Sequence, residues 1–140
     1  MPRLRTATVA IDAFVGVTAI AGGIALAAGL EQDRFPLSWL RGTPFRDYTL
    51  PGIILAGVVG GSAAVAALLT LRSPRSGGTA SMVAGAALIG WIAGEVILLR
   101  RPLSLDSLWE AFYAGAGGAM ALLGQWRREA TAPTPGQLCE

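Results

Sequence analysis

The chain has 140 residues, of which 53% are hydrophobic, 14% are charged and 19 are glycine, and its formal charge is +2. A soluble domain carries about 25% charged residues, so the composition excludes a water-soluble globule, and the apolar content excludes a disordered chain. The basic residues are all Arg and are scattered between apolar runs, which argues against nucleic-acid binding because no basic stripe could follow phosphates.

Four apolar segments follow one another along the chain, each close to the ~20 residues that a helix needs to cross a bilayer. We predict membrane spans over about residues 8–30, 50–71, 80–99 and 107–126. The predicted fold class is therefore all-α: a polytopic membrane protein with a four-transmembrane-helix bundle as one domain over residues 1–128. The polar residues 129–140 are expected to form a disordered tail.

The first apolar segment is predicted to stay in the protein as a helix. Its length exceeds the ~7–15 apolar residues of a secretory signal, and Asp12 inside it is atypical of a signal. The longest connection, residues 31–49, mixes aromatic residues, both charge signs and two prolines, which suits the headgroup zone. Within it we predict a short amphipathic turn around Leu37–Leu40.

The remaining connections are predicted to be short. Pro51 and Gly52 should open the second helix, since proline is tolerated in a first turn. Residues 72–79 read as a flexible basic loop, and Asp106 or Ser107 should cap the fourth helix.

Small residues recur four apart in every predicted span. The pairs are Ala19 and Gly23, Gly57 and Gly61, Gly90 and Gly94 (preceded by Ala86), and Ala114 and Gly118. Gly-Gly pairs also stand at 22–23, 60–61 and 117–118. Such spacing allows membrane helices to approach closely, so we expect these residues to pack the bundle. The alternative is that one spare ridge mediates a homo-oligomer.

Three carboxylates intrude into the spans, and ionisable residues inside a membrane are often functional. Glu95 and Glu110 fall on the same membrane face as the long loop, whereas Asp12 falls on the opposite face. We expect Asp12 to be an interfacial residue paired with Arg5 or Arg72.

The face shared by Glu95 and Glu110 is the predicted site. Its carboxylates could bind a cationic or polar ligand, or could carry protons. The alternative is a structural ion pair with Arg41, Arg46 or Arg100 that holds the long loop down. The candidate residues for a ligand site or an ion pair are Glu95, Glu110, Arg41, Arg46, Asp47, Trp91 and Tyr113.

No enzyme signature is present. The chain has no His and no Lys, so a Ser or Cys nucleophile with a His base and a Lys-containing phosphate loop are both missing. Its single cysteine, Cys139, cannot form an internal disulfide or a cysteine cluster for a metal. We expect a non-enzymatic protein without cofactor or metal.

Two stretches of the sequence resemble motifs of a known group of proteins. Thr43-Pro44-Phe45-Arg46-Asp47-Tyr48 followed by Pro51-Gly52, together with Gly90-Trp91-Ile92, is similar to motifs of small four-helix integral membrane proteins of bacteria. More distantly, the layout resembles the DoxX-type four-helix proteins. The resemblance implies a four-span bundle in a bacterial inner membrane and brings no activity with it.

Two functions are therefore open. The first is a non-enzymatic accessory or interaction protein, whose partners are the lipid bilayer and a second copy or another membrane protein. The second is a small oligomeric transporter, proton-coupled or ligand-binding, that uses Glu95 and Glu110. With both termini in the cytoplasm, six arginines lie inside and five outside, which weakly favours that orientation.

Overall fold

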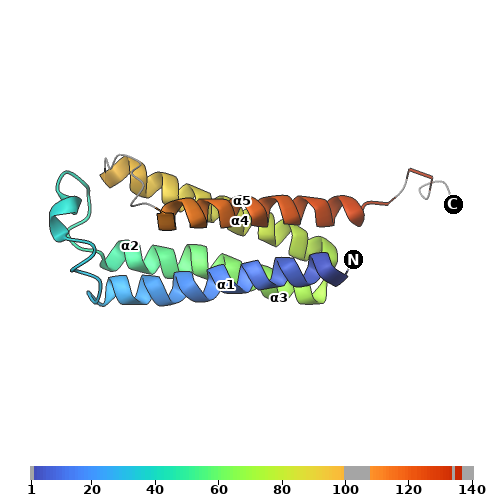
Figure 1. The fold of residues 1–140 in the computed structure, drawn as a ribbon, viewed down its shortest axis with the longest axis horizontal. Helices are drawn as coiled ribbons and strands as arrows, with labels where there is room; N and C mark the ends of the chain where they lie inside the picture. Colours follow the sequence, from blue (N-terminus) through green and yellow to red (C-terminus); the bar gives the residue numbers. More distant parts are fainter. Residues whose placement is uncertain (1, 100–107, 134, 137–140) are drawn as a thin grey trace.

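The computed structural model describes residues 2–99, 108–133 and 135–136. The regular structure of this part of the chain is entirely helical, as the composition predicts (Figure 1). In chain order the elements are α1 (Pro2–Ala27), a 3-10 turn η1 (Leu37–Leu40), α2 (Thr49–Ile54), a π-helical segment η2 (Leu55–Gly60), α3 (Gly61–Arg72), α4 (Pro74–Leu99) and α5 (Leu108–Ala130).

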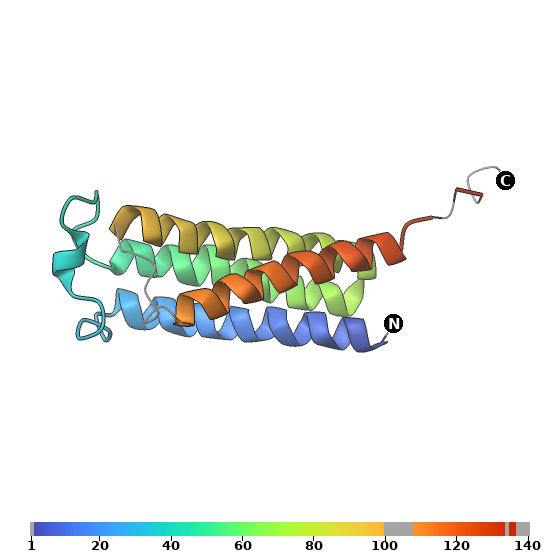
Figure 2. The same cartoon turned by 45° about the horizontal axis from the view of Figure 1, so that its top comes forward.

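The helices form an elongated bundle. The segments α2, η2 and α3 join without a break into one rod, which packs against α1, while α4 packs against both α3 and α5. The helix α5 closes the bundle on α1. The start of α1 and the end of α5 lie at one end of the bundle, and the loop that carries η1 lies at the other, as the two views show (Figures 1 and 2).

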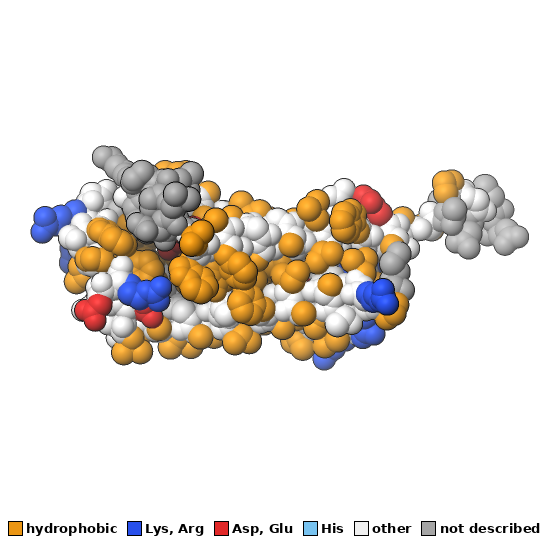
Figure 3. Space-filling model, in the orientation of Figure 1, with side chains coloured by type: hydrophobic (Ala, Val, Ile, Leu, Met, Phe, Trp, Pro, Cys, Tyr) orange, Lys and Arg blue, Asp and Glu red, His pale blue; other side chains and the backbone are white. Residues whose placement is uncertain are grey.

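Three of these helices are long and apolar enough to cross a membrane: α1, the rod Thr49–Arg72 and α4. The predicted fourth span, which corresponds to α5, does not reach the same hydropathy. Large apolar side chains cover the outside, and Val17 and Ile97 are 68% and 73% exposed. On the face in Figure 3, the charged side chains gather near the two ends. This surface suits a multi-pass membrane protein, because lipid rather than water matches its apolar middle.

Apart from Leu88 and Met120, the main core cluster consists of Ala and Val side chains. Val15, Ala19, Ala63, Ala84 and Met120 are buried in its middle, so the helix backbones lie close together. A second cluster under the long loop contains Leu26, Leu40 and Tyr48. It binds that loop to the ends of α1 and α4.

The ends of α1 differ from the predicted span of 8–30. The helix begins six residues earlier, at Pro2, and ends at Ala27. It ends there because Gly29 adopts a left-handed conformation with φ of 74°, which glycine tolerates and which closes a helix. The predicted turn at Leu37–Leu40 is confirmed as η1, and Pro51 lies in the first turn of its helix as expected.

The prediction of a flexible loop over residues 72–79 is wrong. Only Ser73, in an extended conformation, separates α3 from α4, and α4 begins at Pro74. Proline is pre-organised for the first turn of a helix. Gly77 and Gly78, which suggested a loop, are buried in α4 because other helices press closely on them there.

The C-terminal end also differs from the prediction. The helix α5 continues through Ala130, so residues 129 and 130 are helical rather than part of a disordered tail. The predicted capping residues, Asp106 and Ser107, lie outside the described residues.

Each of the three Gly-Gly pairs has one packed and one open member. A Cβ on Gly23 would stand 2.5 Å from the Gly52 carbonyl oxygen, whereas a Cβ on Gly22 would meet nothing within 4 Å. The same contrast separates Gly60 from Gly61 and Gly117 from Gly118. A helix turns by about 100° per residue, so adjacent glycines cannot both face one neighbour.

Some of the predicted small-residue motifs therefore pack within the bundle, and others face open space. Ala19 and Gly23 pack the bundle as predicted, since Ala19 is buried and Gly23 contacts the α2 backbone. For Gly57 and Gly61, and for Gly90 and Gly94, the predicted packing is wrong, because a Cβ at any of them would meet nothing within 4 Å. The spacing of glycines does not reveal which of them face a neighbouring helix.

The contrast between Gly22 and Gly23 gives a matched test. Gly23→Ala should destabilise the protein by about 1–3 kcal/mol, because the new methyl group overpacks the contact with α2. Gly22→Ala should be neutral or stabilising by up to about 1 kcal/mol, because alanine favours helix more than glycine does and open space receives the methyl group. Thermal unfolding in detergent micelles measures both. Equal effects of the two substitutions would contradict the packing described above.

Candidate functional site

The main cavity lies near the loop end of the bundle, between α1, α4, α5 and the long loop, and has a volume of about 510 Å³. Sixteen residues line it: Thr18, Ala19, Gly22, Leu26, Glu31, Arg34, Phe35, Trp39, Leu55, Leu88, Trp91, Ile92, Glu95, Trp109, Glu110 and Tyr113. Small-molecule sites in proteins occupy about 300–1,000 Å³, so this cavity has the size of a ligand site.

Helical periodicity brings these residues to one space. On α4, Leu88, Trp91 and Glu95 are separated by three and four residues, so they share one face of the helix. On α5, Glu110 and Tyr113 are three residues apart and face the same way. On α1, Thr18 and Leu26 line the cavity together with Ala19 and Gly22, and the small size of Ala19 and Gly22 leaves the space open.

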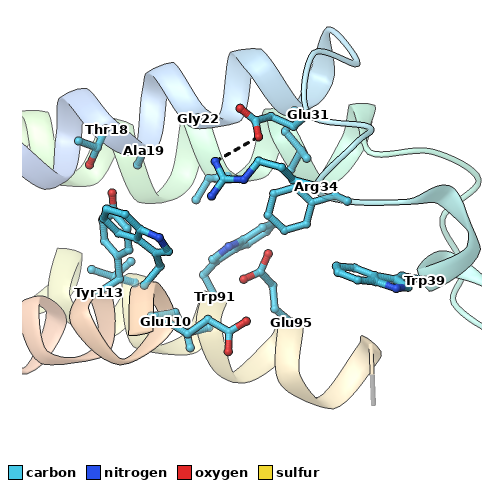
Figure 4. Close-up of a pocket in the computed structure, with 16 residues that line it drawn as sticks. Thr18, Ala19, Gly22, Glu31, Arg34, Trp39, Trp91, Glu95, Glu110 and Tyr113 are labelled. Carbon is cyan, nitrogen blue, oxygen red and sulfur yellow. Dashed lines mark hydrogen bonds and ion pairs between the residues drawn. The ribbon is translucent and has the colours of Figure 1, made fainter. Parts of the chain in front are cut away.

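The charged groups of the cavity come from three separate segments. Glu95 and Glu110 project from α4 and α5, while Glu31 and Arg34 come from the loop after α1 (Figure 4). The Arg34 guanidinium forms an ion pair with Glu31, with 3.5 Å between Nη1 and Oε2. Among the described lining residues, three carboxylates thus face one guanidinium.

Aromatic side chains provide much of the remaining wall. Trp91 and Tyr113 lie on the helices, and Phe35 and Trp39 lie on the loop. Phe35 packs edge-on against Trp39, with 6.1 Å between ring centroids, and makes a similar contact with Tyr48. The Tyr48 hydroxyl donates a hydrogen bond of 3.2 Å to the Pro36 carbonyl oxygen. These contacts hold the aromatic part of the loop over the cavity.

A smaller cavity of about 240 Å³ adjoins the first, between α2, α4 and the loop. Four residues line both cavities: Leu26, Phe35, Trp91 and Glu95. Gly90 and Gly94 line the smaller cavity, where their missing side chains leave room. The lining is mainly apolar.

The structure brings together four of the seven residues predicted from sequence. Glu95, Glu110, Trp91 and Tyr113 all line the main cavity. The other three, which are Arg41, Arg46 and Asp47, are exposed on the long loop and line neither cavity. Asp47 instead accepts a hydrogen bond of 2.9 Å from the Thr49 backbone N–H, which stabilises the start of α2. Arg100 lies outside the described residues.

The predicted pairing of Asp12 with Arg5 or Arg72 is wrong. The Asp12 side chain is fully buried, and its Oδ2 accepts a hydrogen bond of 2.5 Å from the Ser81 hydroxyl. The predicted partner Arg5 instead donates a 2.8 Å hydrogen bond to the Leu71 carbonyl oxygen. The basic residue near Asp12 is Arg127 of α5, which attracts it electrostatically.

The sequence carries one partial signal for the burial of Asp12. It lies four residues before Gly16 and seven before Ala19, on the helix stripe that also contains Gly23. Gly16, Ala19 and Gly23 are all buried against neighbouring helices. On α1 this small-residue stripe faces the bundle and carries Asp12 with it, whereas the equally spaced Gly57 and Gly61 face outward, so the spacing alone does not decide the burial.

The described residues offer no metal-binding cluster. In the part of the chain that the structure describes, no group of three His, Cys, Asp or Glu side chains could hold a metal ion. No protein-family model, curated protein or solved structure matches this chain. The resemblance to small bacterial four-helix membrane proteins therefore stays a prediction.

Labelling can test whether water reaches the main cavity. In a Cys139→Ser background, Thr18→Cys should react with a water-soluble maleimide, because Thr18 lines the cavity. The matched control Thr70→Cys should stay unmodified, because the Thr70 side chain is only 1% exposed. Mass spectrometry of the folded protein in detergent measures the modified fraction. Equal reaction at both positions, or none at position 18, would contradict a water-accessible cavity.

Proposed function

We propose that this chain is a four-span protein of the bacterial inner membrane that binds a small organic cation in the main cavity and transports it as part of an oligomer. The observation that carries the proposal is the cavity itself. It gathers Glu95, Glu110, Trp91 and Tyr113 from two helices into one space of about 510 Å³.

The packing of α5 supports a fourth span. This helix lies along α4 and reaches α1, and Gly117, Met120 and Gly124 are buried in the bundle. Its opposite face exposes apolar side chains, among them Phe112 and Leu122. A helix of modest hydropathy can cross the bilayer when neighbouring helices bury its least apolar face. With both termini in the cytoplasm, the main cavity would then lie toward the outer surface.

The carboxylates of the cavity favour a cation. Glu95 and Glu110 reach the cavity from two different helices, and a carboxylate is a strong acceptor for a positively charged ligand group. Near the end of a membrane span the dielectric constant is lower than in water, so each carboxylate attracts a positive ligand more strongly than it would in water.

The aromatic wall narrows the ligand to an organic cation. A positive charge within about 6 Å of an aromatic ring is attracted to its face, and tryptophan attracts it best. Trp39, Trp91 and Trp109 all line the cavity. A cation with apolar substituents would satisfy both the carboxylates and these rings, whereas a hydrated metal ion would contact the rings poorly.

Transport requires more than one copy, because four helices enclose little space alone. The main cavity lies toward one end of the bundle, and the apolar core of Val15, Ala84 and Met120 closes the path beyond it. A second subunit would have to supply the rest of a pathway. The open glycines Gly57 and Gly61 provide a surface where another helix could approach.

Binding can be measured with benzyltrimethylammonium as the probe. The purified protein should bind it, with a change in tryptophan fluorescence, and should bind the uncharged isostere neopentylbenzene more weakly. Glu95→Gln and Glu110→Gln should each weaken binding of the cation by about tenfold, because each removes one charge-assisted contact. Glu129→Gln is the matched control, since Glu129 is exposed near the end of α5 and outside the cavity.

The same measurements separate binding from a structural role. If the two cavity variants keep their folded state, as judged by circular dichroism and thermal unfolding, and still bind the cation like the parent protein, the proposal fails. If uptake of the cation into reconstituted vesicles is absent while binding is present, transport fails and binding stands.

The second candidate is an accessory protein that acts by binding another membrane protein or a second copy of itself. The outward glycines favour it: Gly57 and Gly61 form a GxxxG motif that the bundle does not use for its own packing. This candidate needs no ligand in the cavity.

Self-association can be tested at these glycines. Gly57→Leu should weaken it by about tenfold or more, because the leucine side chain prevents close approach of another helix. Gly115→Leu is the matched control, since Gly115 is also open but lies on α5. Sedimentation velocity in a mild detergent measures the oligomeric state. A strictly monomeric parent protein, or equal effects of both substitutions, would count against an interface at Gly57.

A further inference from the structure

A second polar cluster lies at the opposite end of the bundle from the main cavity. Asp12 of α1 and Ser81 of α4 are both fully buried and joined by a hydrogen bond of 2.5 Å. The other carboxylate oxygen of Asp12, Oδ1, is buried and has no hydrogen-bond partner among the described residues. A buried carboxylate oxygen without a partner is costly, so this atom calls for a ligand.

Arg127 of α5 presents the complementary group. Its side chain is 4% exposed, and its Nη1 is buried without a hydrogen-bond partner in the same described residues. Asp12 and Arg127 attract each other electrostatically, yet they form no direct ion pair; Arg34 and Glu31 are the ion pair found in the described chain. An acceptor and a donor of opposite charge are thus buried near each other but not in contact.

The first turns of α4 bring these groups together. Gly78 and Ser81 are three residues apart, so they share one face of α4. A Cβ on Gly78 would stand 2.7 Å from the Gly124 carbonyl oxygen and 3.5 Å from the Arg127 Cβ. The missing side chain of Gly78 therefore lets α5 place Arg127 beside the α4 face that carries Ser81.

We propose that Asp12, Ser81 and Arg127 enclose an internal water-binding site, in which water bridges Asp12 Oδ1 to Arg127 Nη1 and so links α1 to α5. Water suits this place because it donates to the carboxylate and accepts from the guanidinium at once. Buried waters in proteins typically make about three hydrogen bonds to such unsatisfied groups.

Other neighbouring groups fit this assignment. Arg5, the other basic group that interacts with Arg127, donates its hydrogen bond to the Leu71 carbonyl oxygen rather than to Asp12. The hydroxyl oxygen of Thr70 of α3 is the third buried polar atom without a hydrogen-bond partner among the described residues, and Thr70 packs against Gly77 at the same end of the bundle. A metal cation is a poor alternative ligand, because the positive charge of Arg127 opposes it.

The bridge would matter most for α5. This helix lacks the hydropathy of the other three, and it buries a charged residue one turn from its end. A water-mediated link from Arg127 to Asp12 gives that charge a counter-ion inside the bundle. The proposal predicts that the two residues act as one energetic unit.

A double-mutant cycle with Asp12→Asn and Arg127→Gln tests the coupling. Each single substitution should lower the ratio of folded to unfolded protein by roughly a hundredfold, because it leaves one buried charge uncompensated. The double substitution should cost much less than the product of the two. Arg128→Gln is the matched control, since Arg128 is exposed and adjacent. Independent effects of the two substitutions would overturn the proposal.

The water itself is tested on the unsubstituted protein, so the result does not depend on whether the variants fold. A crystal structure at a resolution that shows ordered water should have density within hydrogen-bonding distance of both Asp12 Oδ1 and Arg127 Nη1. A dry gap between these atoms, or a direct contact between the carboxylate and the guanidinium, would overturn the water site.

Discussion

The bundle depends on close contact between helix backbones at glycine. Lipid provides no hydrophobic force between helices, so association relies on van der Waals contact and on polar groups buried between them. Gly23 meets the backbone of α2, and Gly85 meets the backbone of α5 at Gly117. Because these approaches set the spacing of the helices, they also set which side chains can meet, both in the main cavity and around Asp12.

Polar groups occupy the two ends of the bundle, and an apolar layer separates them. Glu95, Glu110 and the Arg34–Glu31 pair lie toward the loop end, and Asp12, Ser81 and Arg127 lie toward the termini. Val15, Ala84 and Met120 form the layer between. Asp12 thus lies near the opposite charge of Arg127, and Glu31 pairs with Arg34, as a low-dielectric medium requires. The small residues of α1 leave space on the loop side, whereas the same helix buries Asp12 tightly on the other.

Several features could be predicted because they depend on single segments. The three helices that are long and apolar enough to cross a membrane follow from the summed hydropathy of about twenty residues, and Pro51 and the turn at Leu37–Leu40 follow from local preferences. The convergence of Glu95 with Glu110 could also be predicted, because topology alone places both at the loop end. The one-residue turn at Ser73 could not be, since Gly77 and Gly78 read locally as a loop and become helical only against neighbouring helices.

The sequence by itself determined that the chain is helical, apolar enough for a membrane, and built with its few charges near the ends of its helices. These properties depend on residues that are close together in the sequence, so they can be predicted without knowing which helices pack against one another. Only the tertiary structure decided which glycine of each pair faces a neighbour, that Arg34 rather than Arg41 or Arg46 lines the main cavity, and that Asp12 is buried beside Arg127. Those outcomes depend on how each helix is rotated about its axis, and that rotation is set jointly by all the surfaces that pack against it.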